Sequence, residues 1–294
     1  MTAALETRGL GKAYGRVRAL ADLSLLVEEG EVFGFLGPNG AGKTTTIRLL
    51  LGLLRPTTGV ALVLGRPAGA AGTELRRDVG YLPGELALWP AFTGRRTLDF
   101  LAALTGRPPL DRGLLLERLG LNDDALGRKV RTYSDGMKQK LGIVQALQCR
   151  PRLAFLDEPT KGLDPLVQQA FYEVIAAARA NGTTVFFSSH VLPEVERVCD
   201  RVAMLRAGRL VTVGAVDEVR RAQRRRVHAR FTQPVDAAQL AHFGEVVAQD
   251  GAEVELLVAQ AELAALVARI GMLPLADLTI EPPSLEDVFL EHYR

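Results

Sequence analysis

The sequence has 294 residues, of which 48% are hydrophobic and 24% are charged, as is usual for one large folded domain or two smaller ones. Its 36 basic and 34 acidic residues nearly cancel, so the chain as a whole has no strong attraction to nucleic acid or anionic lipid. Two cysteines exclude a disulfide framework and favour a reducing cytosol. We expect no signal peptide and no membrane span, because charged residues occur early and no long apolar run follows.

Two extended segments joined by a turn, at 5–15 and 21–30, predict a small antiparallel sheet at the start of the chain. Apolar runs that end in turn residues then predict three buried strands, at 31–37, 152–159 and 183–189. Helical patterns lie between these runs, for example at 44–51 and 166–180. Strands that alternate with helices predict a parallel sheet with helices on its faces.

The middle of the chain, about 85–150, has a mainly helical pattern. Leu98, Leu101 and Leu104 fall on one predicted helix face. We interpret this segment as a helical lobe inserted between two halves of the α/β core.

A second pattern begins near residue 217. It predicts a strand (225–231), a short helix (235–243), two strands joined at Asp250-Gly251 (244–249 and 252–259), a helix (261–271) and a strand (275–280). This order is typical of a ferredoxin-like α+β unit. We therefore expect a first domain at 1–216 and a small C-terminal domain at 217–294, which ends in a helix with Ser284 as N-cap and Asp287 in its first turn.

Six arginines crowd the start of that second pattern. They are Arg220, Arg221, Arg224, Arg225, Arg226 and Arg230. A solvated linker or outer helix face is the simpler interpretation, and a surface for phospholipid or a partner is the alternative.

One motif carries specific chemistry. It is the string Gly37, Pro38, Asn39, Gly40, Ala41, Gly42, Lys43, Thr44, which fits G-x-x-x-x-G-K-[ST] at every fixed position. It follows a predicted strand and precedes a predicted helix, so backbone N–H groups and the helix N-terminus can surround phosphate oxygens. We expect Lys43 to reach the β- and γ-phosphates of ATP and the Thr44 hydroxyl to bind Mg²⁺.

Two acidic residues end the strand at 152–159 and complete this predicted site. Asp157 is expected to hold Mg²⁺, directly or through water, and Glu158 to act as general base on the attacking water. His190 ends the strand at 183–189, at the sheet edge where ligands bind in such folds, so we expect it to contact the γ-phosphate.

Together with these residues, the segment from about residue 1 to residue 216 resembles the nucleotide-binding subunit of ABC transporters. Further motifs follow in that family's order: Tyr14 resembles the aromatic that stacks on adenine, Thr45 ends the phosphate loop, and YSDGM at 133–137 resembles the signature. GLDP at 162–165 resembles the D-loop, with Asp164 its key acid. The resemblance implies a RecA-like P-loop NTPase core with an inserted helical lobe.

Departures from the family pattern occur at two places. In the signature, Tyr133, Asp135 and Met137 replace Leu, Gly and Gln, whereas Ser134 and Gly136, which suit a phosphate of the opposite subunit, remain. Because an acid cannot favourably face a phosphate, we expect the Asp135 side chain to point away. In GYLPGE, Gly84 replaces a glutamine that helps to bind Mg²⁺, and Glu85 is a possible substitute.

These departures and the ending EPPSLEDVFLEHYR resemble prokaryotic ATPases that pair with separate permeases exporting drugs or antibiotics. The resemblance implies a head-to-tail dimer, with each ATP between the phosphate loop of one subunit and Ser134 and Gly136 of the other. The second subunit is either another copy or a related ATPase. Closing and opening of this pair would drive a permease at the cytoplasmic face of the cell membrane, and the permease would contact the transported substrate.

Two other functions remain as alternatives. A soluble regulatory or ribosome-associated ABC ATPase would make use of the arginine-rich stretch, although such proteins commonly carry two cassettes, and RNA binding that falls steeply with salt would support it. A small-molecule kinase is the other alternative. The signature, D-loop and His190 together disfavour it, and phosphate transfer to an acceptor other than water would support it.

Overall fold

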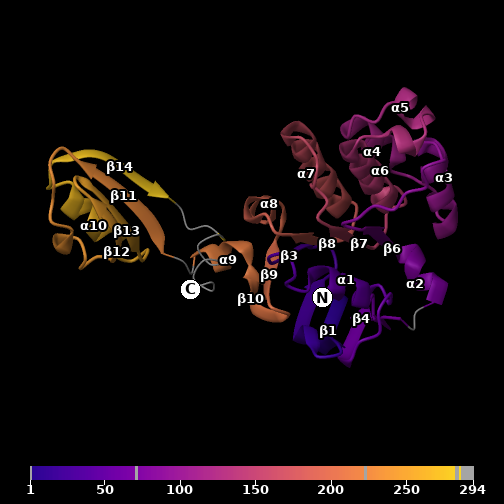
Figure 1. Cartoon of the computed structure of the whole chain (residues 1–294), viewed down its shortest axis with the longest axis horizontal. Helices are drawn as coiled ribbons and strands as arrows, with labels where there is room; N and C mark the ends of the chain where they lie inside the picture. The colour runs from indigo at the N-terminus through magenta and orange to yellow at the C-terminus, as the bar shows by residue number, and fades with distance from the viewer. Residues whose placement is uncertain (1, 70–71, 222–223, 282–284, 286–294) are drawn as a thin grey trace. The chain divides into compact units, whose positions relative to one another are not determined.

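A computed structural model of the chain describes residues 2–69, 72–221, 224–281 and 285 (Figure 1). It divides the chain into two compact units, Met1–Gly214 and Ala215–Arg294. No helix in the described ranges is long and apolar enough to cross a membrane. The predicted last helix, with Ser284 and Asp287, lies outside the described residues.

A six-stranded sheet forms the centre of the first unit, in the order β10-β9-β3-β8-β7-β6. The five strands from β9 to β6 pair in parallel, and β10 returns beside β9 after two residues, so the sheet is mixed. Its strands are β3 (Val32–Leu36), β6 (Val79–Leu82), β7 (Leu153–Asp157), β8 (Thr184–Ser189), β9 (Arg201–Arg206) and β10 (Arg209–Ala215). The middle strands β3, β7 and β8 are buried on both faces, which explains their unbroken apolar sequences.

An antiparallel sheet lies beside it in the order β2-β1-β4-β5. Its strands are β1 (Ala3–Tyr14), β2 (Val17–Glu28), β4 (Thr58–Val63) and β5 (Arg66–Pro67). Helix α1 (Lys43–Leu50) contacts β2 and β4 of this sheet and β7 of the central sheet, so it packs between the two. Helices α7 (Pro165–Ala180) and α8 (Leu192–Val198) contact β8, and α8 also contacts β3 (Figure 1).

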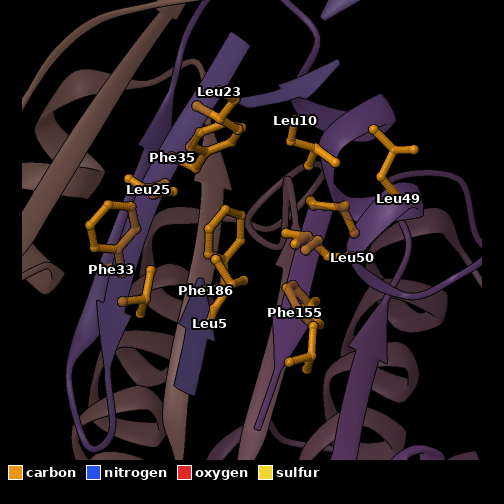
Figure 2. Packing of buried hydrophobic residues seen from close by; sticks show 14 of the residues in the cluster. Leu5, Leu10, Leu23, Leu25, Phe33, Phe35, Leu49, Leu50, Phe155 and Phe186 are labelled. Carbon is orange, nitrogen blue, oxygen red and sulfur yellow. The ribbon is translucent and has the colours of Figure 1, made fainter. Parts of the chain in front are cut away.

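The space between the two sheets is filled with leucine and phenylalanine. Figure 2 shows Leu5, Leu10, Leu23 and Leu25 of the antiparallel sheet gathered with Phe33, Phe35, Phe155 and Phe186 of the central sheet and with Leu49 and Leu50 of α1. The Phe186 ring contacts three others, with centroid distances of 5.9 Å to Phe33, 5.1 Å to Phe35 and 5.5 Å to Phe155. This packing fixes α1, and therefore the loop that precedes it, against the central sheet.

A group of helices lies between β6 and β7 in the sequence. They are α3 (Gly94–Thr105), α4 (Arg112–Arg118), α5 (Asp123–Gly127), the 3₁₀ turn η1 (Val130–Thr132) and α6 (Asp135–Leu147); α2 (Gly72–Asp78) precedes β6. Of the leucines predicted to share one face of α3, Leu98 is fully buried and Leu104 is 65% exposed. Leu104 stands one residue before the end of α3.

The second unit has a four-stranded antiparallel sheet in the order β12-β13-β11-β14. Its elements are α9 (Val216–Arg221), β11 (Arg225–Phe231), the 3₁₀ turn η2 (Ala237–Gln239), β12 (Glu245–Asp250), β13 (Glu253–Val258), α10 (Leu263–Ile270) and β14 (Leu275–Glu281). Its core contains Val227, Leu256, Leu266 and Ile270. The short helix expected at 235–243 is only η2, because Asp236 caps a single 3₁₀ turn through the N–H of Ala238.

Several arginines of the basic stretch have acidic partners within this unit. Arg224 and Glu245 form an ion pair of 2.7 Å, Arg226 pairs with Glu255, and Arg230 lies 3.6 Å from Asp277. This pairing favours a solvated sheet face over a phospholipid surface.

Candidate functional site

The phosphate loop joins β3 to α1, and three of its glycines are required by its geometry. Gly40 and Gly42 have φ angles of 81° and 108°, which side chains rarely adopt. A methyl group at Gly37 would lie 2.4 Å from the carbonyl oxygen of Leu205, and one at Gly42 would lie 2.7 Å from that of Ala19. Gly42 caps α1 without a side-chain bond, so the first N–H groups of the helix have no side-chain acceptor at the N-cap.

Lys43 is held inside this loop, with only 6% of the residue exposed. Its Nζ donates to the carbonyl oxygens of Gly37 at 2.6 Å and Pro38 at 3.4 Å, and lies 3.3 Å from Oε1 of Glu158. A buried ammonium among oxygen atoms is well placed to exchange these partners for phosphate oxygens.

The two residues expected at the metal lie together although they come from distant parts of the sequence. The Thr44 hydroxyl donates to Oδ2 of Asp157 at 2.9 Å. Asp157 is 1% exposed, and its Oδ1 accepts a hydrogen bond from the Ser188 hydroxyl. One hydroxyl and one carboxylate are a set that fits Mg²⁺, which takes few protein oxygens and completes its shell with water and phosphate oxygens. Gly84 borders the site, since a methyl group there would lie 3.4 Å from Oδ2 of Asp157.

Glu158 lies between Lys43 and His190. Its Oε2 is 2.7 Å from Nδ1 of His190. In the part of the chain that the structure describes, its buried Oε1 has no hydrogen-bond donor, although Lys43 lies at ion-pair distance. The contact with Lys43, at 3.3 Å, is therefore an ion pair, whereas the contact with His190 is a hydrogen bond. The backbone φ of Glu158 is 50°, an unusual value for a residue with a side chain, and its N–H donates to Ser188 at 3.0 Å. The carboxylate is therefore held in a strained, fixed position.

Ser134, Gly136 and Asp164 form a second group at the N-termini of α6 and α7. Oγ of Ser134 accepts from the N–H of Met137 at 3.2 Å, and Oδ1 of Asp164 accepts from that of Val167 at 3.0 Å. A methyl group at Gly136 would lie 3.0 Å from the carbonyl oxygen of Gly162 in the D-loop. Each of the two polar side chains caps its own helix, and neither is hydrogen-bonded to the first group.

Three further residues of interest lie around these groups. The half-exposed ring of Tyr14 lies at the end of β1, with Nζ of Lys12 at 5.1 Å from its centroid, and Thr45 occupies the first turn of α1. The exposed Asp135 carboxylate accepts from Lys138 at 2.9 Å, and this partner lowers the pKa of Asp135. It therefore stays ionised at the start of α6.

Two residues that contact the site were missed by the sequence analysis. Ser188 supports Asp157, and the side chain of Gln139 in α6 donates to the carbonyl oxygens of Glu158 and Pro159. Ser188 could have been found from its place near the end of β8, two residues before His190. Gln139 had no comparable signal, because its contact joins two elements that periodicity cannot bring together.

Comparisons with known proteins identify the family of the chain. A family model described as ABC transporter matches residues 20–161, and one described as the C-terminal domain of EvrA-like ABC transporters matches 223–281. An ABC transporter ATP-binding protein of Nostoc sp. is 45% identical over 209 residues, 69% of this chain and 62% of that protein, so this chain spans less than two thirds of it. A bacitracin transport ATP-binding protein of Bacillus licheniformis is 33% identical over 302 residues, 99% of this chain and 97% of that protein. A solved structure of an ATP-binding subunit of an ABC transporter has a TM-score of 0.70 and 33% identity, and covers 74% of this chain and 92% of its own.

Proposed function

Because this chain belongs to the ATP-binding subunits of ABC transporters, we propose that it hydrolyses ATP to power export through a separate membrane permease. The observation that carries this proposal is the convergence of Lys43, Thr44, Asp157 and Glu158 at one end of the central sheet. These four groups supply a cation for the triphosphate, two oxygens for a metal ion and a base for water.

Each residue has a separate task in this mechanism. Loop N–H groups and Lys43 bind and orient the phosphates, while Thr44 and Asp157 hold Mg²⁺, which supplies charge neutralisation when bound. Glu158 takes the proton of the attacking water through Oε1, which has no hydrogen-bond donor among the described residues. His190 holds the other oxygen of that carboxylate at 2.7 Å and faces the γ-phosphate. Tyr14 offers a ring for adenine, and Thr45 extends the loop.

A second subunit is part of the proposal. Ser134 caps α6 through its oxygen lone pair, so its hydroxyl proton remains available to a phosphate that approaches from outside the chain. The N-terminus of α6 adds a favourable dipole. We expect two head-to-tail subunits to enclose two ATP molecules and to separate after hydrolysis.

The permease is expected to contact α3 and the groove beside it, at the cytoplasmic face of the membrane. Trp89 and Phe100 are exposed and pack edge to face at 5.1 Å, and Leu104 continues this apolar surface one turn along α3. A groove of about 460 Å³ adjoins it, lined in part by Leu104, Arg76 and Arg77. A surface patch of exposed aromatic and aliphatic side chains is typical of protein interfaces. The bacitracin-transport relative supports a drug or antibiotic as the exported compound.

The strand orders also support the proposed domain organisation. The central sheet with the helices inserted between β6 and β7 supports a RecA-like core with a helical lobe, in an ATPase domain at 1–216. In the second unit, the order β12-β13-β11-β14 is the one expected of a ferredoxin-like domain, at 217–294.

Substitution of Glu158 tests the function. Glu158→Gln keeps the size of the side chain and removes its basicity, so ATP should bind and hydrolysis should stop, trapping a dimer in size-exclusion chromatography with MgATP. Wild-type protein with ADP is the control and should elute as a monomer. A Glu158→Gln protein that hydrolyses ATP at the wild-type rate would refute the role of Glu158. One that is inactive yet monomeric with bound ATP would refute the two-subunit site.

A further inference from the structure

The backbone carbonyl groups of Glu158 and Pro159 are both hydrogen-bonded to one side chain of helix α6. Nε2 of Gln139 donates to the carbonyl oxygen of Glu158 at 3.2 Å and to that of Pro159 at 2.8 Å. Gln139 is 7% exposed, so water competes little for these two hydrogen bonds. Both N–H groups of its amide are therefore used to hold the segment that carries the catalytic carboxylate.

Glu158 needs such support because its backbone is in an unfavourable conformation. A φ of 50° is unfavourable for a residue with a β-carbon and persists only where neighbouring structure enforces it. On one side, the N–H of Glu158 is tied to Ser188 of β8 at 3.0 Å. On the other side, Gln139 ties its carbonyl to α6.

Gln139 also lies close in the sequence to Ser134 and Gly136, the residues of α6 that are proposed to bind the ATP of the partner subunit. Gln139 lies in the second turn of the helix that begins after Ser134 and whose first turn contains Gly136. Gly136 approaches the D-loop so closely that a methyl group there would lie 3.0 Å from the carbonyl oxygen of Gly162. The first two turns of α6 therefore rest on the loop that follows Glu158, and a shift of this helix must displace that loop.

We propose that Gln139 is a positioning residue that links the two ATP sites of the dimer. This inference rests on the proposed function. When Ser134 and Gly136 of one subunit bind the ATP held by its partner, α6 is fixed, and Gln139 then fixes Glu158, which serves the ATP held by its own subunit. Occupation of one site thus prepares the carboxylate of the other, and hydrolysis should depend cooperatively on ATP concentration.

The test is Gln139→Met, which keeps the length of the side chain and removes both donors. We expect kcat to fall about tenfold, which corresponds to about 1.4 kcal/mol in the barrier, while the ATP concentration at half-maximal rate changes less than about twofold. The Hill coefficient, which cannot exceed the number of sites, should fall from between 1 and 2 toward 1. In a Glu158→Gln background, Gln139→Met should still form the ATP-dependent dimer, since the groups that touch ATP are intact.

Gln148→Met is the matched control. Gln148 is also a buried glutamine at the end of α6, and its Nε2 donates to a main-chain carbonyl, that of Leu98, at 3.1 Å, but it does not contact the loop after Glu158. It should lower thermal stability at least as much as Gln139→Met and leave kcat and the Hill coefficient unchanged.

Two outcomes would overturn the proposal. One is a Gln139→Met protein with wild-type kcat and Hill coefficient, and the other is loss of the trapped dimer, which would show that the residue serves assembly alone. A wild-type protein without ATPase activity would instead refute the proposed function itself.

Discussion

The hydroxyl of Tyr133 fits so closely against Gly94 that the two residues should contribute to stability as a coupled pair. Tyr133 is 5% exposed, and its hydroxyl donates to the carbonyl oxygen of Ala125 at 2.6 Å. Burial raises the pKa of this phenol, which keeps the proton that makes the bond. A methyl group at Gly94 would lie 2.1 Å from the hydroxyl oxygen and 3.1 Å from the ring carbon that bears it.

These distances set the expected changes in the free energy of unfolding. Tyr133→Phe removes this hydroxyl bond, although the Ala125 carbonyl still accepts from the N–H of Arg128 at 3.1 Å, and should cost about 0.5–1.5 kcal/mol in free energy of unfolding. Gly94→Ala should cost about 1–3 kcal/mol by overpacking, less up to about 1 kcal/mol gained in helix propensity. With Phe at 133 the closest clash is gone, so Gly94→Ala should cost about 1–2 kcal/mol less in that background than in the wild type.

Urea unfolding followed by tryptophan fluorescence measures this cycle directly. Trp89 is the single tryptophan of the chain, and its ring stacks on Phe92 at 5.6 Å in the same group of helices. It therefore reports the unfolding of the part that contains both substitutions, whatever the second unit does. If the two costs add to within about 0.3 kcal/mol, the close contact between Gly94 and Tyr133 is not real, and the reasoning fails.

Three further substitutions or modifications test the site and the core. Lys43→Ala should weaken ATP binding at least about tenfold in a fluorescent-nucleotide titration and abolish turnover, and surviving ATPase activity would reject the site. Gly84→Gln should lower the Mg²⁺ concentration needed for half-maximal rate by placing an amide oxygen near Asp157, whereas Gly84→Leu should not; equal values would show that this position does not reach the metal. Burial raises the pKa of Cys199 well above its usual value, so its neutral thiol favours the fold below the unfolded-state pKa and this contribution is lost as pH rises toward the folded-state pKa. At pH 8 in the folded protein, iodoacetamide should therefore label Cys149 at least about tenfold faster than Cys199, and Cys149→Ser should remove the fast phase; a fast phase that remains in this variant would reject the assignment.

How much the sequence predicts depends on whether a feature is local. The buried strands at 31–37, 152–159 and 183–189 were predicted correctly to within two residues, because an unbroken apolar run has few other places to fold. Periodicity indicates that Leu98 and Leu104 share a helix face, but it does not show that Leu98 is buried and Leu104 exposed.

The contacts within the site needed the sheet order, which periodicity does not contain. The sequence places Asp157 at the tip of one strand and Thr44 after another, but β8 lies between those two strands in the sheet. Thr44 reaches Asp157 because α1 packs on β7, and that packing comes from the core between the two sheets. The role of Gln139 could not be predicted for the same reason, because nothing in the sequence marks a helical glutamine as a contact to the site until its partner carbonyls are known.

The altered signature illustrates how backbone geometry can be preserved while side chains change. Tyr133 points into the helical group, where its hydroxyl is bound by Ala125, so it adds stability without approaching the outer surface of α6. Asp135 adds a negative charge to the first turn of α6, which stabilises the helix but would repel a phosphate. Its ion pair with Lys138 at 2.9 Å offsets that repulsion, because the pair is nearly neutral at the distance of a bound nucleotide. Ser134 keeps its hydroxyl proton and Gly136 its close approach to the D-loop, so the two positions that the proposed dimer requires are the two that the departures leave intact.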